Sequence, residues 1–260
     1  EVQSWKTSAG LVQMTKDAVY GNRMLHVLVE QPKGTTAVTW TAKVTRYGDV
    51  GQGRLPGNAR YSQASSMIPL DGTARELAQK LGVTDASMDA TTRAKRIYDD
   101  VLSEMKYDKS GIGWGRGSFE HATTVCEGNC TDFHSRFIGV ARAAGMPVRF
   151  TMGIPLKDGK SSYNSYHCWA HYLDDGRWKP VDISEADKVA DTDPAKAQWF
   201  FGNLDPNRIS LSFGRDVPLA PAAKSGPRNY FVFPYAEADG REVPLNKKEN
   251  WRFDWRALDG

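Results

Sequence analysis

Hydrophobic side chains change their spacing several times along the chain, and each spacing predicts a different kind of element. The segments 25–30 and 37–46 are rich in Val, Thr and Trp and are separated by a Pro-Lys-Gly turn, a pattern typical of β-strands. Between residues 73 and 107 the apolar positions instead recur every three or four residues, which predicts two helices divided near Gly82. We therefore expect a β-rich beginning followed by a helical pair.

A third helix is predicted to begin near Asn129 and to stop at Gly145, with Pro147 just beyond its end. Apolar residues recur along it at helical spacing, so the pattern is amphipathic. Cys130 falls in the first turn of this helix. The apolar positions are Phe133, Phe137, Val140, Ala141 and Ala144.

Strand-like sequence follows the third helix. The segments 148–154, 166–173 and 178–183 are rich in strand-forming residues, and similar sequence returns at 229–240. Helices followed by consecutive strands favour an α+β fold, in which helices pack on an antiparallel sheet.

The composition is that of a globular protein and excludes two classes of partner. Of the 260 residues, 40% are hydrophobic, and the net charge of +3 is carried by scattered Lys and Arg, so we expect no nucleic-acid surface. No apolar run approaches the ~20 residues of a membrane span. The chain begins at Glu1 without a Met, which favours a mature form that is secreted or periplasmic after removal of a signal peptide.

A predicted hairpin brings a histidine close to an aspartate. The Asp-Gly dipeptide at 175–176 is a strong signal for a tight turn. Counting outward from that turn, Trp169 faces Asp182 and His167 faces Ser184, so His167 and Asp182 are diagonal neighbours about 7–8 Å apart at Cα. A carboxylate at that spacing reaches an imidazole N–H. A three-residue loop would change the register and place Asp182 on the opposite face.

The position of Cys130 favours a reactive thiol. Unpaired N–H groups and the helix dipole at a helix start stabilise thiolate over thiol. The alternative is a buried cysteine that packs as a small hydrophobic side chain. Together with an imidazole at His167 oriented by Asp182, however, the thiol supplies the three parts of nucleophilic acyl transfer.

Three segments carry a resemblance to a known family. They are GNCTDFHSRFIGVARAAGMPVRF at 128–150, YHCWAHYL at 166–173 and WKPVDISEAD at 178–187. Together they resemble the bacterial branch of the transglutaminase-like superfamily, the transglutaminase-like cysteine peptidases. The core of that superfamily presents Cys, His and Asp in this order on a helix start and two adjacent strands.

The resemblance implies an enzyme with Cys130 as nucleophile, His167 as base and acid, and Asp182 as the carboxylate that orients the histidine. His171 stands where members commonly have an acidic residue. The implied reaction cleaves the amide of a peptide or protein substrate through a thioester, most simply by hydrolysis in a cysteine peptidase or amidase. The alternatives are transfer to an amine, as in a cross-linking transglutaminase, and a non-catalytic binding module on the same fold.

The resemblance also implies a division of the chain. We expect a papain-like transglutaminase core at residues 66–190, preceded by a β-rich segment at 1–65. A β-rich extension at 191–260 is expected to pack on this core.

Cofactor and metal sites are not expected, although alternatives exist for the cysteines. The glycine-rich loop at 109–117 lacks the spacing of a dinucleotide-binding loop. A Cys126–Cys168 disulfide would leave Cys130 as the unpaired thiol. A zinc site is a further alternative, although the spacing of its residues is unusual. Its ligands would be Cys126, Cys130 and His134, with His167 or Cys168.

Two tryptophans are candidates for contact with the substrate or for the oxyanion site. Trp114 lies in the glycine-rich loop, and Trp169 lies two residues after His167. The backbone N–H of Cys130 is the other oxyanion donor that we expect.

Overall fold

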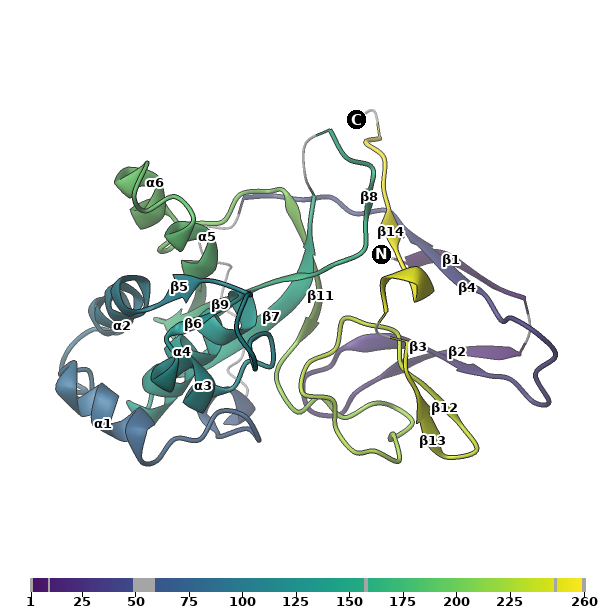
Figure 1. Ribbon diagram of the computed structural model, residues 1–260, viewed down its shortest axis with the longest axis horizontal. Coiled ribbons are helices and arrows are strands. Elements are labelled where there is room, and N and C mark those ends of the chain that lie inside the picture. The colour runs from purple at the N-terminus through teal and green to yellow at the C-terminus, as the bar shows by residue number, and fades with distance from the viewer. Residues whose placement is uncertain (1, 9, 49–58, 157–158, 246, 259–260) are drawn as a thin grey trace.

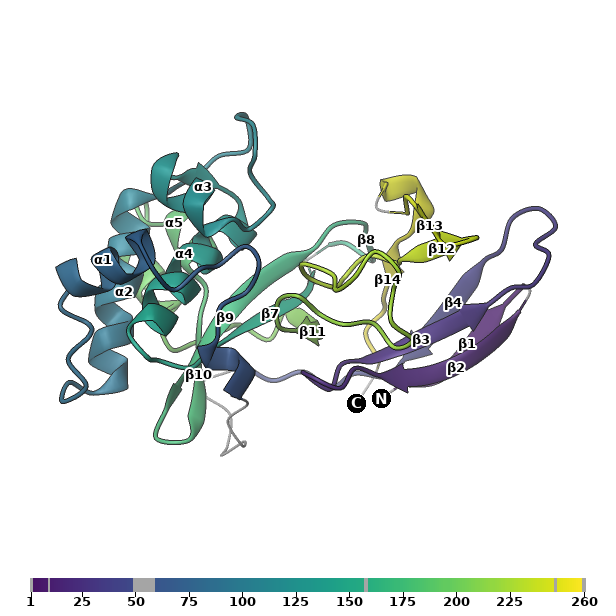
Figure 2. The ribbon, with the colours of Figure 1, turned by 90° about the horizontal axis from the view of Figure 1, so that it is seen from below.

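The computed structural model describes residues 2–8, 10–48, 59–156, 159–245 and 247–258. Helices cover one side of a central antiparallel sheet, and most of the short two-stranded pairs gather at the far end of that sheet, whereas one pair lies among the helices (Figure 1). The view from below shows the same separation, with the helices grouped at one end and the N-terminal strands at the other (Figure 2). The mixture of helices and antiparallel strands confirms the predicted α+β class.

The N-terminal segment forms two antiparallel pairs. Strand β1 (Val2–Thr7) pairs with β4 (Val38–Ala42), and β2 (Leu11–Lys16) pairs with β3 (Arg23–Leu28). The sequence pattern predicted the strands β3 and β4, each with slightly different bounds.

Helix α4 (Cys130–Ala143) is the centre of the helical layer. It contacts α1 (Thr73–Lys80), α2 (Ala90–Glu104), α3 (Phe119–Thr124) and the sheet. Every residue of α4 from Cys130 to Arg142 is buried, the polar ones included, because other helices cover the face opposite the sheet.

Gly139 permits the close crossing of α3 over α4. A Cβ at this position would lie 2.3 Å from Cδ2 of Phe119, far inside van der Waals contact. Any larger residue would push α3 away from the helix that begins with Cys130.

The central sheet has the order β10-β9-β7-β11. Its strands are β7 (Val148–Pro155), β9 (His167–Asp174), β10 (Arg177–Val181) and β11 (Arg208–Phe213), and all neighbours are antiparallel. Strand β9 therefore lies inside the sheet, and its first residue, His167, is at the end nearest the start of α4.

The β9–β10 hairpin has the predicted register, but it is shorter than expected. Arg177 pairs with Asp174 and Pro180 pairs with His171. The ladder ends at Val181, however, and the predicted facing of His167 by Ser184 is wrong, because residue 184 lies in helix α5 (Ile183–Asp187). The Asp182 side chain accepts a hydrogen bond from the Glu185 N–H and so caps this helix. The spacing of Asp182 and Glu185 in D-x-x-E was the available sequence signal.

The C-terminal part contains less strand than its sequence indicated. The prediction of a strand across 229–240 is wrong for most of its length, since β12 (Ala236–Ala238) alone is extended there and pairs with β13 (Arg241–Val243). Pro234 lies just before this strand and cannot donate to a ladder. The remaining described elements are η1 (Ala59–Ser62), β5 (Lys106–Tyr107), β6 (Glu127–Gly128), β8 (Ser162–Tyr163), α6 (Pro194–Trp199), η2 (Lys248–Asn250) and β14 (Phe253–Asp254).

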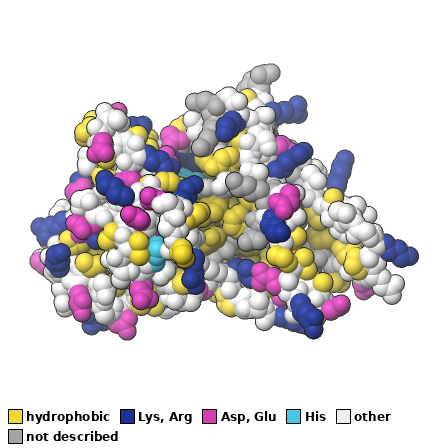
Figure 3. All heavy atoms as spheres, in the orientation of Figure 1, with side chains coloured by type: hydrophobic (Ala, Val, Ile, Leu, Met, Phe, Trp, Pro, Cys, Tyr) yellow, Lys and Arg dark blue, Asp and Glu magenta, His cyan; other side chains and the backbone are white. Residues whose placement is uncertain are grey.

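Aromatic contacts join the C-terminal part to the residues beside the central sheet. The ring of Tyr166 lies 5.8 Å from that of Tyr230 and 5.5 Å from that of Phe233, and Phe233 in turn lies 5.1 Å from Trp251. Hydrophobic side chains gather in the hollow between the helical side and the β-rich side of the molecule (Figure 3). None of the helices in the described part of the chain is long and apolar enough to cross a membrane.

Candidate active site

The start of α4 is built around reciprocal capping. Asn129 is the N-cap, and its Oδ1 accepts hydrogen bonds from the N–H of Thr131 at 2.9 Å and from the Thr131 hydroxyl at 2.5 Å. In return, Oδ2 of Asp132 accepts the Asn129 N–H at 2.9 Å. Cys130 is therefore the first helical residue, and its own N–H has no acceptor within the helix.

Asp132 also fixes the glycine-rich loop beside the helix start. Its two carboxylate oxygens accept the N–H groups of Gly115 at 2.7 Å and Gly117 at 3.0 Å. Trp114 lies in this clamped loop with 37% of its surface exposed. The structure thus keeps Trp114 on a loop that is tied to the start of α4. A part for Trp114 in a reaction stays a prediction.

His167 and Asp182 are in direct contact. His167 Nε2 lies 2.7 Å from Asp182 Oδ2, and both residues are buried. The bend that ends β10 and starts α5 brings the carboxylate back toward the first residue of β9. Asp182 Oδ1 is held separately, by the Ser184 hydroxyl at 3.1 Å and the Glu185 N–H at 3.2 Å.

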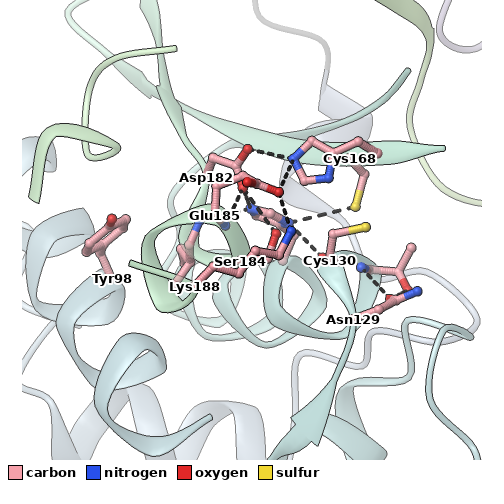
Figure 4. Close-up of polar contacts among 12 residues, drawn as sticks. Tyr98, Asn129, Cys130, Cys168, Asp182, Ser184, Glu185 and Lys188 are labelled. Atoms are coloured by element: carbon pink, nitrogen blue, oxygen red, sulfur yellow. Dashed lines mark hydrogen bonds and ion pairs between the residues drawn. The ribbon is translucent and has the colours of Figure 1, made fainter. Parts of the chain in front are cut away.

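Cys130 lies beside Cys168 (Figure 4). Its thiol also hydrogen-bonds the His167 side chain. Burial is the largest influence on its thiol and opposes ionisation, since Cys130 is 2% exposed. Hydrogen bonds from Cys168 and His167 and the charge of the imidazolium outweigh burial, so the pKa of Cys130 is held well below its usual range. Burial and the contact with Cys130 raise the pKa of Cys168, which therefore remains a protonated donor.

The pKa of His167 is shifted in the direction that favours an ion pair with Cys130. Burial disfavours the imidazolium, but the charge and hydrogen bond of Asp182, with a smaller contribution from Cys130, raise the pKa of His167 to about 10. Burial would also protonate Asp182, yet the charges of His167 and Arg208 hold the pKa of Asp182 well below its usual range. These directions all favour a thiolate, an imidazolium and a carboxylate over the neutral forms of the three groups.

His134 supports this arrangement from behind. Its Nδ1 lies 2.7 Å from the Cys130 carbonyl, and its Nε2 accepts the Ile183 N–H at 3.3 Å, which assigns the proton to Nδ1. Burial lowers the pKa of His134, so the ring is neutral. From the sequence, His134 was considered only as a ligand of the alternative zinc site, although its spacing of four residues from Cys130 on one helix was the signal that the two lie on the same face.

Arg208 also contacts the Asp182 carboxylate, a contact between distant segments that the sequence does not indicate. Its Nη1 lies 2.6 Å from Asp182 Oδ2, and its Nη2 lies 2.5 Å from Asp205 Oδ2. The guanidinium lies 5.1 Å from the ring of Trp169, which is 2% exposed and also neighbours His167 at a ring distance of 6.1 Å. This burial leaves Trp169 little surface for a substrate and favours a packing role beneath the site.

Two alternative roles were open for the cysteines, a disulfide and a zinc site. All three cysteines are described, and each is a free thiol, so the structure contains no Cys126–Cys168 disulfide. Cys126 instead points toward the Thr123 carbonyl and Arg136. Within the described residues, no group of three or more His, Cys, Asp or Glu side chains is arranged to hold a metal ion.

The contact between Cys168 and Cys130 leads to a testable prediction. Cys168→Ala removes an S–H donor to the thiolate, so the pH at which Cys130 becomes reactive is expected to rise by about half a unit to one unit. Cys168→Ser keeps a donor and is the matched control. The rate of iodoacetamide labelling of Cys130, followed by mass spectrometry across a pH series, measures the shift. Superimposable profiles for the Ala variant and the unmodified protein would rule out this role of Cys168.

Comparisons with known proteins agree with the geometry. Residues 75–183 match the family model of the transglutaminase-like superfamily. The chain is 31% identical over 226 residues to a Haemophilus influenzae protein described as an "Uncharacterized protein", a match that covers 75% of this chain and 61% of that relative. The chain thus spans less than two thirds of the relative's length.

A solved structure shows the same fold. "A Putative Cysteine Protease from Cytophaga hutchinsonii" superposes with a TM-score of 0.53 at 16% identity, covering 82% of this chain and 71% of that chain. At this identity the likeness concerns the fold alone. The helix-start cysteine, the first residue of β9 and the cap of α5 all lie inside the segment that matches the family model. Residues 75–183 thus match the transglutaminase-like superfamily, and the matched segment contains Cys130, His167 and Asp182.

Proposed function

We propose that the protein is a cysteine-dependent enzyme that cleaves amide bonds through a thioester on Cys130. The observation that carries this proposal is the single buried cluster in which a helix-start thiol hydrogen-bonds an imidazole that lies 2.7 Å from a carboxylate. A non-catalytic module would gain nothing from burying three ionisable groups whose pKa values favour a reactive thiolate.

Acylation follows from the charges of the cluster. The Cys130 thiolate attacks the carbonyl carbon of the amide, and the new oxyanion meets the unpaired Cys130 N–H at the start of α4. The imidazolium of His167 then gives its proton to the leaving nitrogen as the C–N bond breaks. An amine leaves, and the acyl group remains on sulfur as a thioester with a neutral His167 beside it.

Deacylation reverses the roles. Neutral His167 removes a proton from the incoming nucleophile, which attacks the thioester, and the C–S bond breaks to restore thiolate and imidazolium. Water as the nucleophile makes the protein a peptidase or amidase, and this is the activity that we propose. A primary amine in the same place would make it a transglutaminase.

The deciding experiment shows whether water or an amine accepts the acyl group from Cys130. A mixture of peptides that contain backbone and glutamine amides is incubated with the protein in heavy-oxygen water, with and without excess methylamine. Peptide acids that carry heavy oxygen, formed at the same rate with and without amine, support hydrolysis. Methylamide products would contradict hydrolysis and would support transamidation instead. The absence of either product, together with slow labelling of Cys130 by iodoacetamide at pH 6, would refute the enzyme proposal.

The pH dependence of turnover should reflect the pKa values of Cys130 and His167. His167 donates a proton during acylation, and its pKa is raised to about 10, so activity is expected to decline only as the pH rises through about 10. The acidic limit is set by protonation of the thiolate and should lie well below the ~8.5 of an ordinary thiol. A rate profile for peptide cleavage from pH 4 to pH 11 measures both limits. An acidic limit near that of a free thiol would contradict the proposed ion pair.

The nature of the substrate and the location of the protein stay predictions. A peptide or protein amide is expected from the reaction class. A secreted or periplasmic location is expected from the sequence.

A further inference from the structure

We propose that Arg208 is a positioning residue with two effects. It holds the Asp182 carboxylate in place, and it reduces the stabilisation that this carboxylate gives to the His167 imidazolium. This inference rests on the proposed function and concerns the proton that His167 must release. Both cations contact the same carboxylate oxygen. Asp182 Oδ2 accepts hydrogen bonds from His167 Nε2 at 2.7 Å and from Arg208 Nη1 at 2.6 Å.

The guanidinium fixes the carboxylate through a rigid fork. Its second nitrogen bonds Asp205 at 2.5 Å, and its plane lies 5.1 Å from the buried ring of Trp169. A planar group held at both ends in this way cannot follow a rotation of the carboxylate. Because Ser184 and Glu185 hold the other oxygen of Asp182, the carboxylate has one orientation, and that orientation points at His167.

The guanidinium also changes the proton affinity of the histidine. Two cations that share one oxygen repel each other, so Arg208 disfavours the imidazolium even while Asp182 favours it. An imidazolium held too tightly is a poor acid for the leaving nitrogen. The charged and titratable groups that surround His167 are Asp182 and Glu185 at the start of α5, Cys130 and His134 of α4, Cys168 of β9 and Arg208 of β11, with Asp205 behind Arg208.

A direct measurement of the His167 pKa tests this inference without any substrate. Cys130→Ala removes the thiolate and brings the His167 pKa down into a range where titration is practical. The chain has five histidines, so the ring nitrogens of His167 can be resolved by NMR after labelling of histidine with nitrogen-15. In this background Arg208→Gln is expected to raise the His167 pKa by about one unit, because a like charge is lost.

Two further variants give the test its controls. Arg228→Gln removes another arginine that pairs with a carboxylate, Glu242, and should leave the His167 pKa unchanged. Arg208→Lys keeps the charge without the fork, so the His167 pKa should stay near its original value while turnover falls with Cys130 restored. Arg208→Gln with Cys130 restored should lower kcat about threefold to tenfold and leave KM unchanged.

The outcomes are distinct. An unchanged or lower His167 pKa in folded Arg208→Gln would overturn the inference. If the Gln variant does not fold, full kcat in Arg208→Lys would overturn it instead. A raised His167 pKa in a protein that cleaves no amide would refute the proposed function and leave the role of Arg208 on the triad intact.

Discussion

Replacing Cys130 by Ala is expected to reduce amide cleavage at least about 10⁴-fold, with no change in the fold. No other described side chain at the start of α4 offers a nucleophile beside His167, so the thioester cannot form. The remaining rate would come from binding and from the N–H groups at the helix start. Because Ala removes one sulfur atom from a buried position, the free energy of unfolding should fall by no more than about 1 kcal/mol.

The measurement is turnover of the best peptide found in the acceptor experiment, together with mass spectrometry for the acyl-enzyme. Cys126→Ala is the matched control, since this cysteine lies four residues earlier and contacts Thr123 and Arg136 rather than the triad. It should retain activity within about twofold. Equal loss in both variants would point to damage of the helix start and would contradict the assignment of Cys130 as the nucleophile.

Asp182→Asn should lower kcat by about 10⁴-fold. The Asp182 carboxylate accepts a hydrogen bond from Nε2 of His167 at 2.7 Å, which leaves Nδ1 of the ring to exchange a proton with the thiol. An amide can donate to Nε2 instead, and the ring would then carry its proton on Nδ1, where it cannot accept the proton of Cys130. Loss of the negative charge also lowers the pKa of His167, so the ion pair reverts to neutral thiol and imidazole.

The same substitution should reduce the free energy of unfolding by about 3 kcal/mol, because Arg208 is left buried with Asp205 as its remaining carboxylate. Asp187→Asn, in the same helix, is the control. Its carboxylate accepts the Tyr107 N–H at 2.9 Å and lies 3.8 Å from Lys106, away from His167. That control should lose stability and keep kcat. Denaturant titration with steady-state kinetics separates the two effects, and an active Asp182→Asn enzyme would remove Asp182 from the triad.

The sequence was sufficient to predict the parts of the site that depend on local structure. The helix start at Asn129 was readable from the apolar spacing and the stop at Gly145, and it placed Cys130 in the first turn. The Asp-Gly turn predicted the register of the β9–β10 hairpin, from which the proximity of His167 and Asp182 followed. That proximity arises in a different way, since Asp182 is the cap of a helix and not a ladder residue.

What could not be predicted depends on contacts between distant segments. Arg208 reaches Asp182 because β11 forms the edge of the central sheet beside β7, and nothing near residue 208 indicates that strand order. The burial of the polar residues of α4 depends on such contacts too. Arg136 is buried, with Asp100 of α2 at 2.9 Å. A strand pattern at 229–240 failed because, among the described residues, the strand that pairs with this segment reaches only Ala236–Ala238.

The position of Arg208 has a consequence for how the protein may be divided. The family model ends at residue 183, just after the last triad residue, and suggests a natural place to cut the chain. A fragment that stopped there would keep Cys130, His167 and Asp182 but would lose Arg208, one of the two cationic groups that contact Oδ2 of the buried Asp182 carboxylate. The proposed catalytic unit is therefore expected to extend through β11, and shorter fragments would leave the buried Asp182 carboxylate without its Arg208 partner.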